Sequence, residues 1–414
     1  DVFTKQSEVP GYSRMVPLSE IASSANDYNL NIPRYIDSSE PEDIQDLHAH
    51  LHGGIPGRDI DALKDFWEAF PALRQKLFKP LREGYLQLAV DPSSVQQTIM
   101  NSEEYLALRS ETAEVVRYWW QDHRDKLIDI NASIKPADLI ESLSESLLAM
   151  FRGRSLVDEY AVYEQLMSYW NETMHDDMAL IMSEGWEGAA KPRKTVEDKD
   201  RKISETPDLV IGSGRSATKY KMDLIPPHLI VAEYFPELQN QLDELNSKLE
   251  AATQAVEEFM EENSSEEGLL SAAMDEDKLN KTLATARLWE AKREGSDPDE
   301  VEALTTVIAL YEEEADAKKA VKEATAILDQ KTLSQYGKLT VADIKSLVFD
   351  DKWGATMEWR VGTELVALVR TLIERINRLA DRYTETVKDL DNEVAALGAK
   401  VAAHLAAMGV SNAR

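Results

Sequence analysis

The sequence predicts a mainly α protein with a helical domain, a small β-ribbon, an antiparallel coiled-coil hairpin and a long C-terminal helix. Apolar residues recur at helical spacing through most of the chain, and this periodicity indicates amphipathic helices. Glycines and alternating apolar and basic residues instead gather in one middle stretch, as in a short β-ribbon. We therefore divide the chain into segments 1–40, 41–189, 190–234, 235–337 and 338–414.

Composition limits the possible functions. The chain has 414 residues, a net charge of -30 and no cysteine. Disulfides and thiolate metal sites are therefore excluded, which agrees with a cytoplasmic location. The negative charge opposes non-specific nucleic-acid binding, so any DNA contact must be local or come from a partner. Because the chain begins Asp-Val-Phe-Thr, without methionine, we expect it to be a piece of a longer protein.

The first two segments differ in pattern. Residues 1–40 are predicted to be extended except for one helical turn near Ser19–Ala22, whereas the next segment has helical periodicity. Its aromatic and methionine stripes are interpreted as core rather than as a ligand site. We expect a helix from Asp59 to Phe70, a strand near Leu86–Val90, and helices over Ser102–Ile130, from Pro136 to Phe151 and from Val157 to Ile181.

Residues 190–226 are locally basic in an otherwise acidic chain. Leu209–Ile211 and Thr218–Met222 flank a glycine-containing turn and predict a β-hairpin. Such a ribbon can lie on DNA phosphates. The candidate phosphate contacts are Arg193, Lys194, Lys219 and Lys221. The alternative is a solvated ribbon whose charges balance neighbouring acids.

Two heptad stretches predict the coiled-coil hairpin. Leucines and other apolar residues keep alternating spacings of four and three from Leu238 to Phe259, and similar spacing returns from Val307 to Leu328 with Glu314 as a polar exception. A charged insert, 261–300, lies between them. We expect the two helices to pack antiparallel, because each seam can then cover the other.

The last segment has an apolar stripe that predicts a long helix. Five of its positions, from Val361 to Leu405, are eleven residues apart, and this repeat gives a nearly straight seam. A helix of about fifty residues would reach about 75 Å, which is longer than a compact domain needs. We interpret it as a docking helix, with a break possible near Thr386, or alternatively as a long core helix. The candidate docking residues are Leu365, Leu372, Leu379, Leu390, Leu397 and Leu405.

Two clusters of polar residues have side chains that could carry out chemistry. His48, His50 and His52 have ligand-type side chains, but a helix would turn His50 away from the other two. His175-Asp176-Asp177 lies within a helical pattern and is interpreted as a solvated edge rather than an acid–base site. No phosphate loop, dinucleotide motif or nucleophile elbow occurs.

Several motifs together resemble the C-terminal part of the modification subunits of type I restriction-modification systems. The resemblance extends over nearly the whole chain, and Asn-Asp-Tyr-Asn-Leu-Asn is its most specific phrase. The matching stretches are Tyr12–Arg14, Pro17–Ile21, Asn26–Ile36, Gly53–Pro56, Gly185–Trp186, Ala189–Arg193, Leu224–Pro227, Leu229–Ala232, Asp350–Trp353 and His404–Gly409.

This resemblance implies a role in a DNA adenine N6-methyltransferase. Family members bind S-adenosylmethionine through a glycine-containing loop and methylate a flipped-out adenine with an Asn-Pro-Pro-aromatic motif. Neither motif is present here, so no catalytic, cofactor-binding or metal-binding residue is assigned. Residues 1–40 would be the trailing edge of the methyltransferase domain. The C-terminal helices would pack against the specificity subunit, which reads the DNA sequence.

Two alternatives from other classes remain. A free-standing coiled-coil scaffold would self-associate, whereas a modification-subunit fragment would capture a specificity subunit. A metal-dependent hydrolase would use His48, His50 and His52 and would contain stoichiometric metal.

Overall fold

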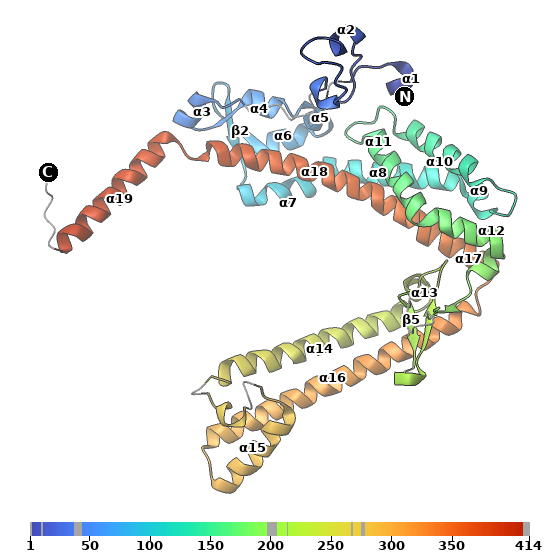
Figure 1. Cartoon of the computed structure of the whole chain (residues 1–414). Coiled ribbons are helices and arrows are strands. Elements are labelled where there is room, and N and C mark those ends of the chain that lie inside the picture. The colour runs from blue at the N-terminus through green and yellow to red at the C-terminus, as the bar shows by residue number, and fades with distance from the viewer. Residues whose placement is uncertain are drawn as a thin grey trace. The chain divides into compact units, whose positions relative to one another are not determined.

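The structure is a computed structural model of the whole chain (Figure 1). It describes residues 2–9, 11–36, 44–196, 205–212, 214–265, 268–274 and 278–408.

The regular elements are mostly helices, as predicted. The α-helices are α1 Val2–Lys5, α2 Leu18–Ile21, α3 Leu47–His52, α4 Gly57–Asp61, α5 Lys64–Ala69, α6 Pro71–Leu77, α7 Val95–Met100, α8 Glu103–Asp122, α9 Arg124–Ile128, α10 Pro136–Phe151, α11 Glu159–Tyr169, α12 His175–Ala189, α13 Pro227–Tyr234, α14 Pro236–Asn263, α15 Lys281–Glu294, α16 Pro298–Tyr336, α17 Val341–Ser346, α18 Ala355–Thr384 and α19 Val387–Ala407. The 3-10 segments are η1 Ile32–Arg34, η2 Pro92–Ser94, η4 Gly214–Ser216 and η5 Ser271–Ala273, and the π-helical segments are η3 Trp170–Met174 and η6 Leu347–Gly354. The strands are β1 Ile55–Pro56, β2 Phe78–Arg82, β3 Tyr85–Leu88, β4 Arg193–Lys194, β5 Leu209–Ile211 and β6 Thr218–Lys221. This inventory confirms the mainly α prediction.

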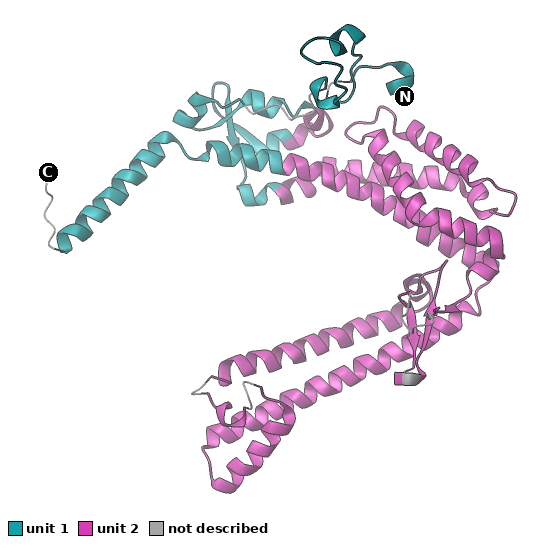
Figure 2. Cartoon of the chain, viewed as in Figure 1, with its two compact units in different colours: residues 1–64, 74–95, 374–414 teal, residues 65–73, 96–373 magenta. Residues whose placement is uncertain are grey.

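The chain forms two compact units (Figure 2). Unit 1 combines residues 1–64, 74–95 and 374–414, and unit 2 combines residues 65–73 and 96–373. Segments far apart in the sequence thus contribute to unit 1, which residue patterning does not reveal.

Unit 1 contains a small antiparallel sheet in the order β1-β3-β2. The predicted strand near Leu86 is its central strand β3, and Ile55 pairs with Leu86. Gly54 precedes β1 with φ +90, and a Cβ there would lie 2.8 Å from Leu81 Cδ2. Only glycine therefore fits this approach without rearrangement. Strands β1 and β2 were not predicted, because each contains a proline and β1 has only two residues.

Two of the predicted helices of unit 2 differ from the observed ones. One is broken into two helices, and another contains a π-helical turn. The expected helix over Ser102–Ile130 is two helices, since α8 ends at Asp122 and the buried His123 separates it from α9. The His123 Nδ1 atom lies 2.9 Å from the carbonyl oxygen of Trp119. The predicted helix through Ile181 is present as α11, η3 and α12, with a π-helical turn in its middle.

A similar division occurs earlier in the chain. The single helix expected from Asp59 to Phe70 is replaced by α4 and α5, which are separated at Ala62–Leu63. Periodicity continues across such breaks, so it predicts the buried face better than the helix ends.

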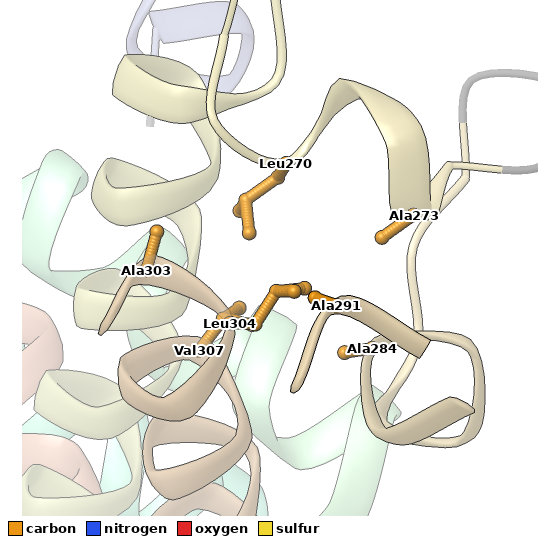
Figure 3. Packing of buried hydrophobic residues seen from close by; sticks show 7 residues of the cluster. All are labelled: Leu270, Ala273, Ala284, Ala291, Ala303, Leu304 and Val307. Carbon is orange, nitrogen blue, oxygen red and sulfur yellow. The ribbon is translucent and has the colours of Figure 1, made fainter. Parts of the chain in front are cut away.

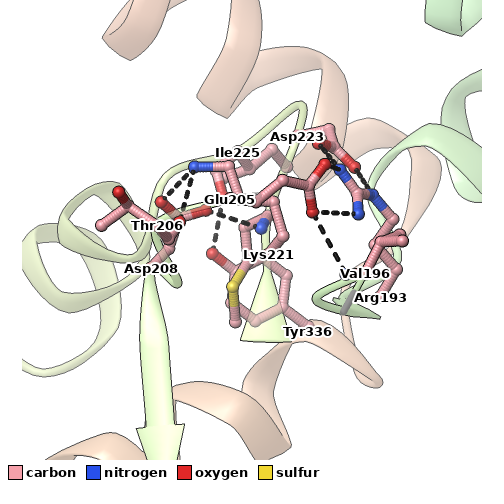
Figure 4. Close-up of polar contacts among 10 residues, drawn as sticks. Arg193, Val196, Glu205, Thr206, Asp208, Lys221, Asp223, Ile225 and Tyr336 are labelled. Atoms are coloured by element: carbon pink, nitrogen blue, oxygen red, sulfur yellow. Dashed lines mark hydrogen bonds and ion pairs between the residues drawn. The ribbon is translucent and has the colours of Figure 1, made fainter. Parts of the chain in front are cut away.

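The predicted ribbon is the second sheet, in the order β4-β6-β5. Strands β5 and β6 form the expected hairpin, with Val210 opposite Lys219, and β4 pairs with the other edge of β6 so that Arg193 lies opposite Lys221. Behind the ribbon, the buried Tyr336 of α16 donates a 2.6 Å hydrogen bond to the carbonyl oxygen of Ile225 (Figure 4). This hydrogen bond ties the segment that follows the ribbon to the C-terminal end of α16.

The predicted coiled-coil hairpin is present as α14 and α16, which lie side by side (Figure 1). Val256 and Leu328 are buried in its seam. The polar exception Glu314 accepts a 3.1 Å hydrogen bond from Thr253 of the opposite helix and a 2.6 Å bond from Lys318. These donors satisfy the carboxylate, which explains how the seam tolerates a charged residue.

The insert between the two long helices is not simply a polar linker. It contains η5 and α15, which pack on the first turns of α16 around a small core (Figure 3). Its buried members are Leu270, Ala273, Ala284, Ala291, Ala303, Leu304 and Val307. Most are alanines, and their low hydrophobicity hid this core from the sequence pattern.

None of the helices in the described part of the chain is both long enough and apolar enough to span a bilayer.

Candidate functional site

The apolar stripe of the last segment is divided between two helices. The expected helix of about fifty residues is interrupted at Glu385–Thr386, between α18 and α19. Thr386 Oγ1 accepts from the Asp389 amide at 3.2 Å, and Asp389 Oδ2 accepts from the Thr386 amide at 3.1 Å. This capping box makes the weak-helix patch a helix start.

The two halves of the stripe have opposite environments. Leu365, Leu372 and Leu379 of α18 are 1%, 0% and 0% exposed, so these candidate docking residues are core residues of their own chain. The three candidates on α19 are instead 39% to 51% exposed, namely Leu390, Leu397 and Leu405. Among the candidate docking residues, only those on α19 are therefore exposed.

Helix α19 presents a continuous apolar face to solvent. Val387, Val394, Val401 and Met408 extend the exposed leucine row, and Val394 is 69% exposed. None of the described residues of α19 is buried. An exposed apolar row of this length on a helix is typical of a surface that binds another helix.

Neighbouring residues hold the start of α19. Helix α3 packs against α19, and the His50 ring lies 5.0 Å from the ring of Tyr383, just before the break. The hydroxyl of the buried Tyr383 also accepts a 3.4 Å hydrogen bond from the Asp46 amide. These contacts position the beginning of the exposed helix.

Acids neutralise Arg193 and Lys221 of the basic ribbon (Figure 4). The Arg193 guanidinium binds Glu205 at 2.8 and 2.9 Å and Asp223 at 2.6 and 2.9 Å. Hydrogen bonds from Arg193 lower the pKa of Glu205 to about 2. Lys221 is paired with Asp208 at 2.7 Å. Two of the four candidate phosphate contacts are thus already bound to carboxylates.

The other two candidates differ from these. Lys194 is exposed and Lys219 is half-buried, and neither forms an ion pair with any residue that the structure describes. Lys194 pairs with Tyr220 across the ribbon, whereas Lys219 pairs with Val210, so the two lysines lie on opposite faces. They do not form one phosphate-binding cluster.

A pocket of about 430 Å³ beside the ribbon has more carboxylates than ammonium groups in its lining. Asp208, Asp223 and Asp351 line it together with Lys221 and Lys352. Burial, assisted by the nearby carboxylates of Glu233 and Asp350, raises the pKa of Asp351. Because carboxylates outnumber the amines, this pocket does not favour phosphate.

Unit 2 contains a buried ion pair between Lys352 and Asp177. The Lys352 ammonium of η6 is 2.6 Å from Asp177 Oδ2 and donates at 2.6 Å to the Leu224 carbonyl oxygen. Trp353 Nε1 donates to the same carboxylate at 2.8 Å. Burial raises the pKa of Asp177 and lowers that of Lys352, while each partner opposes the shift of the other. The pair connects α12, η6 and the segment before α13.

The interpretation of Asp177 as a solvated edge was wrong, because its side chain is 6% exposed. A sequence signal existed, since Asp177 is three residues after Met174 and four before Ile181, on the apolar stripe of α12. An acid on an apolar stripe requires a buried partner. His175 and Asp176 are exposed, as expected for a helix edge.

The three histidines lie on α3, as the helical context predicted. The His48 and His52 rings share one face with centroids 4.6 Å apart, whereas His50 Nε2 contacts Gln45 Oε1 at 2.9 Å. Arg82 Nη1 lies 3.1 Å from His48 Nδ1. Over the described residues, no three His, Asp or Glu side chains gather in a way that could hold a metal ion.

Comparisons with protein-family models, curated proteins and solved structures find no match for this chain.

Proposed function

We propose that this chain is an assembly segment whose terminal helix α19 docks onto helices of another polypeptide. The exposed apolar row of α19 is the observation that supports this function, because docking would remove these side chains from water. The capping box at Thr386 favours a rigid helix start, so the row is presented in a defined direction.

The family resemblance suggests the partner. On that basis the chain is the C-terminal region of the modification subunit of a type I restriction-modification DNA adenine N6-methyltransferase, and the partner is the specificity subunit. S-adenosylmethionine would be bound elsewhere in the full subunit, because the donor-binding and Asn-Pro-Pro-aromatic motifs are absent from this chain. The proposed role here is to join the catalytic domain to the subunit that reads DNA.

DNA contact by the ribbon forms a minor part of this proposal. Arg193 and Lys221 are occupied by acids, so Lys194 and Lys219 are the remaining candidates for phosphate contacts in the assembled complex. Such contacts would support binding without reading sequence.

Co-purification tests the docking function. The full chain should capture a co-expressed specificity subunit, and Leu397→Glu should abolish capture by placing a charge in the apolar row. Ala399→Glu is the matched control, because it adds the same charge to another exposed position of α19. Capture that is unaffected by Leu397→Glu, or no capture by the unaltered chain, would contradict the proposal.

The scaffold hypothesis predicts no capture of a specificity subunit. The metal-hydrolase hypothesis is not favoured by the geometry of α3, since His50 is directed away from the His48–His52 pair.

A further inference from the structure

The pattern within α19 specifies more than a general apolar face. Five exposed positions follow heptad spacing, with valine at the first position of three heptads and leucine at the fourth position of the first two, where the third heptad has His404. The valines are Val387, Val394 and Val401, and the leucines are Leu390 and Leu397. In parallel coiled coils this combination of β-branched and leucine positions favours two strands, so the direction of pairing has to be argued from other residues.

Charge is distributed unequally along the same helix. Asp389, Asp391 and Glu393 lie in its first half together with Lys388, so this half is net negative, whereas Lys400 is the charged residue of its second half. Glu393 and Lys400 directly precede Val394 and Val401, so both flank the apolar row. Both side chains are exposed, and neither is ion-paired to a residue in the described ranges.

We infer that α19 pairs antiparallel with α19 of a second copy of this chain. We align the two helices so that Val394 lies opposite Leu397 of the second copy. In this antiparallel register Leu390 lies opposite Val401 of the second copy. Residues that precede the first heptad position then face each other across the seam. Glu393 therefore meets Lys400 of the second copy, and the twofold axis repeats this pair.

The parallel alternative is poorer on two counts. It would place Glu393 opposite Gly398 of the second copy, so no ion pair would form across the seam. It would also place His404 opposite the second copy's His404, whereas the antiparallel register places His404 opposite Val387. Antiparallel helix dipoles add a further favourable contribution. The Glu393–Lys400 pairs and the position of His404 thus favour the antiparallel orientation.

This pairing goes beyond the proposed docking function and uses the same face. A specificity subunit and a second copy would compete for α19, so self-association alone does not test the docking function. The size of the dimer interface also limits its strength. A helix of 21 residues extends over about 30 Å, so we expect a reversible dimer in the micromolar range.

Sedimentation velocity of the full chain over a concentration series tests the inference. The unaltered chain should show a monomer–dimer equilibrium, and Leu397→Glu should remove it because residue 397 takes part in two central layers. Ala399→Glu should leave the equilibrium unchanged. Circular dichroism should show equal helix content in all variants, since these positions are exposed.

Charge exchange tests the orientation. Glu393→Lys and Lys400→Glu should each weaken the dimer about tenfold, because each replaces two attractive pairs by two repulsive ones. The double variant E393K/K400E should restore the original dissociation constant. Single variants without effect would overturn the antiparallel register. A chain that stays monomeric, or a dimer insensitive to Leu397→Glu, would overturn the pairing, whereas capture of a specificity subunit is measured separately.

Discussion

Lys352 of the π-helical segment η6 and Asp177 of α12 form a buried ion pair, with Nζ 2.6 Å from Oδ2 and the two side chains 10% and 6% exposed. Each charge has additional hydrogen-bond partners, the Leu224 carbonyl oxygen for Lys352 and the Trp353 indole for Asp177. Three segments that are distant in sequence therefore meet at one salt bridge. Such satisfied pairs stabilise little in net terms but are costly to break.

Replacing Asp177 by Asn should destabilise the chain by about 3–5 kcal/mol, because Lys352 would remain buried without a counter-charge. Urea unfolding monitored by circular dichroism measures the change. Arg124→Met is the matched control, since it breaks the Arg124–Asp350 pair, whose side chains are 37% and 33% exposed. That pair should contribute about 1 kcal/mol or less. Equal losses in both variants would contradict the buried-pair interpretation.

Two glycines near the start of α18 should respond oppositely to alanine. A Cβ on Gly354 would lie 2.7 Å from Trp120 Nε1, which donates at 2.9 Å to the Phe349 carbonyl oxygen. Gly354→Ala should therefore destabilise by about 1–3 kcal/mol. Gly362 has nothing within 4 Å of an added Cβ, so Gly362→Ala should stabilise by about 0.5–1 kcal/mol through helix propensity. The unfolding midpoints of the two variants are the measurement. If both midpoints move in the same direction, the prediction is wrong.

Glu314→Leu should stabilise the α14–α16 hairpin by about 1 kcal/mol, because it replaces a polar seam residue with an apolar one. We also expect the alignment of α14 against α16 to become less well defined, since the hydrogen bond from Thr253 that joins the two helices would be lost. Thermal unfolding measures the first effect, and amide hydrogen exchange along α14 measures the second. A variant of lower stability would indicate that the hydrogen bonds of Glu314 exceed the cost of its burial.

Acidification should release the ribbon contacts of Glu205. Its folded pKa of about 2 is below the ordinary value of 4.5, mainly because Arg193 donates hydrogen bonds to the carboxylate. A lowered pKa stabilises the folded state above about pH 4.5, and this contribution is lost as the pH falls towards 2. The carboxyl carbon shift of Glu205, followed by nuclear magnetic resonance, should titrate near 2, and Glu205→Gln supplies its assignment. Titration at the ordinary value would show that the ion pair does not form.

Replacing Lys194 and Lys219 by Glu should weaken DNA binding of the assembled complex and reduce its salt dependence. Because the two lysines lie on opposite faces of the ribbon, we expect one of them to contact phosphate, so the slope of log affinity against log salt should fall by about 1 in magnitude. Arg193 and Lys221 are not suitable for this test, because their replacement would disturb the ribbon itself. Unchanged DNA binding by a normally assembled complex would remove the ribbon from the proposed function.

Local patterns were sufficient where an element depends on its own residues. Heptad spacing predicted α14 and α16, proline at the first turn predicted the start of α10, and the glycine-containing turn predicted the β5–β6 hairpin. The capping residues Thr386 and Asp389 were visible as weak helix formers, although their pattern did not decide between a continuous helix and a break. These features follow from backbone and capping preferences within a few residues.

The sequence by itself thus determined that the chain is mainly α, where its hairpins lie and which stripe is apolar. Only the tertiary structure decided that Leu372 is covered while Leu397 is exposed, and that acids distant in sequence bind Arg193 and Lys352. The physical reason is that periodicity depends on neighbours three or four residues away, whereas burial and charge pairing depend on segments that fold together from distant parts of the chain.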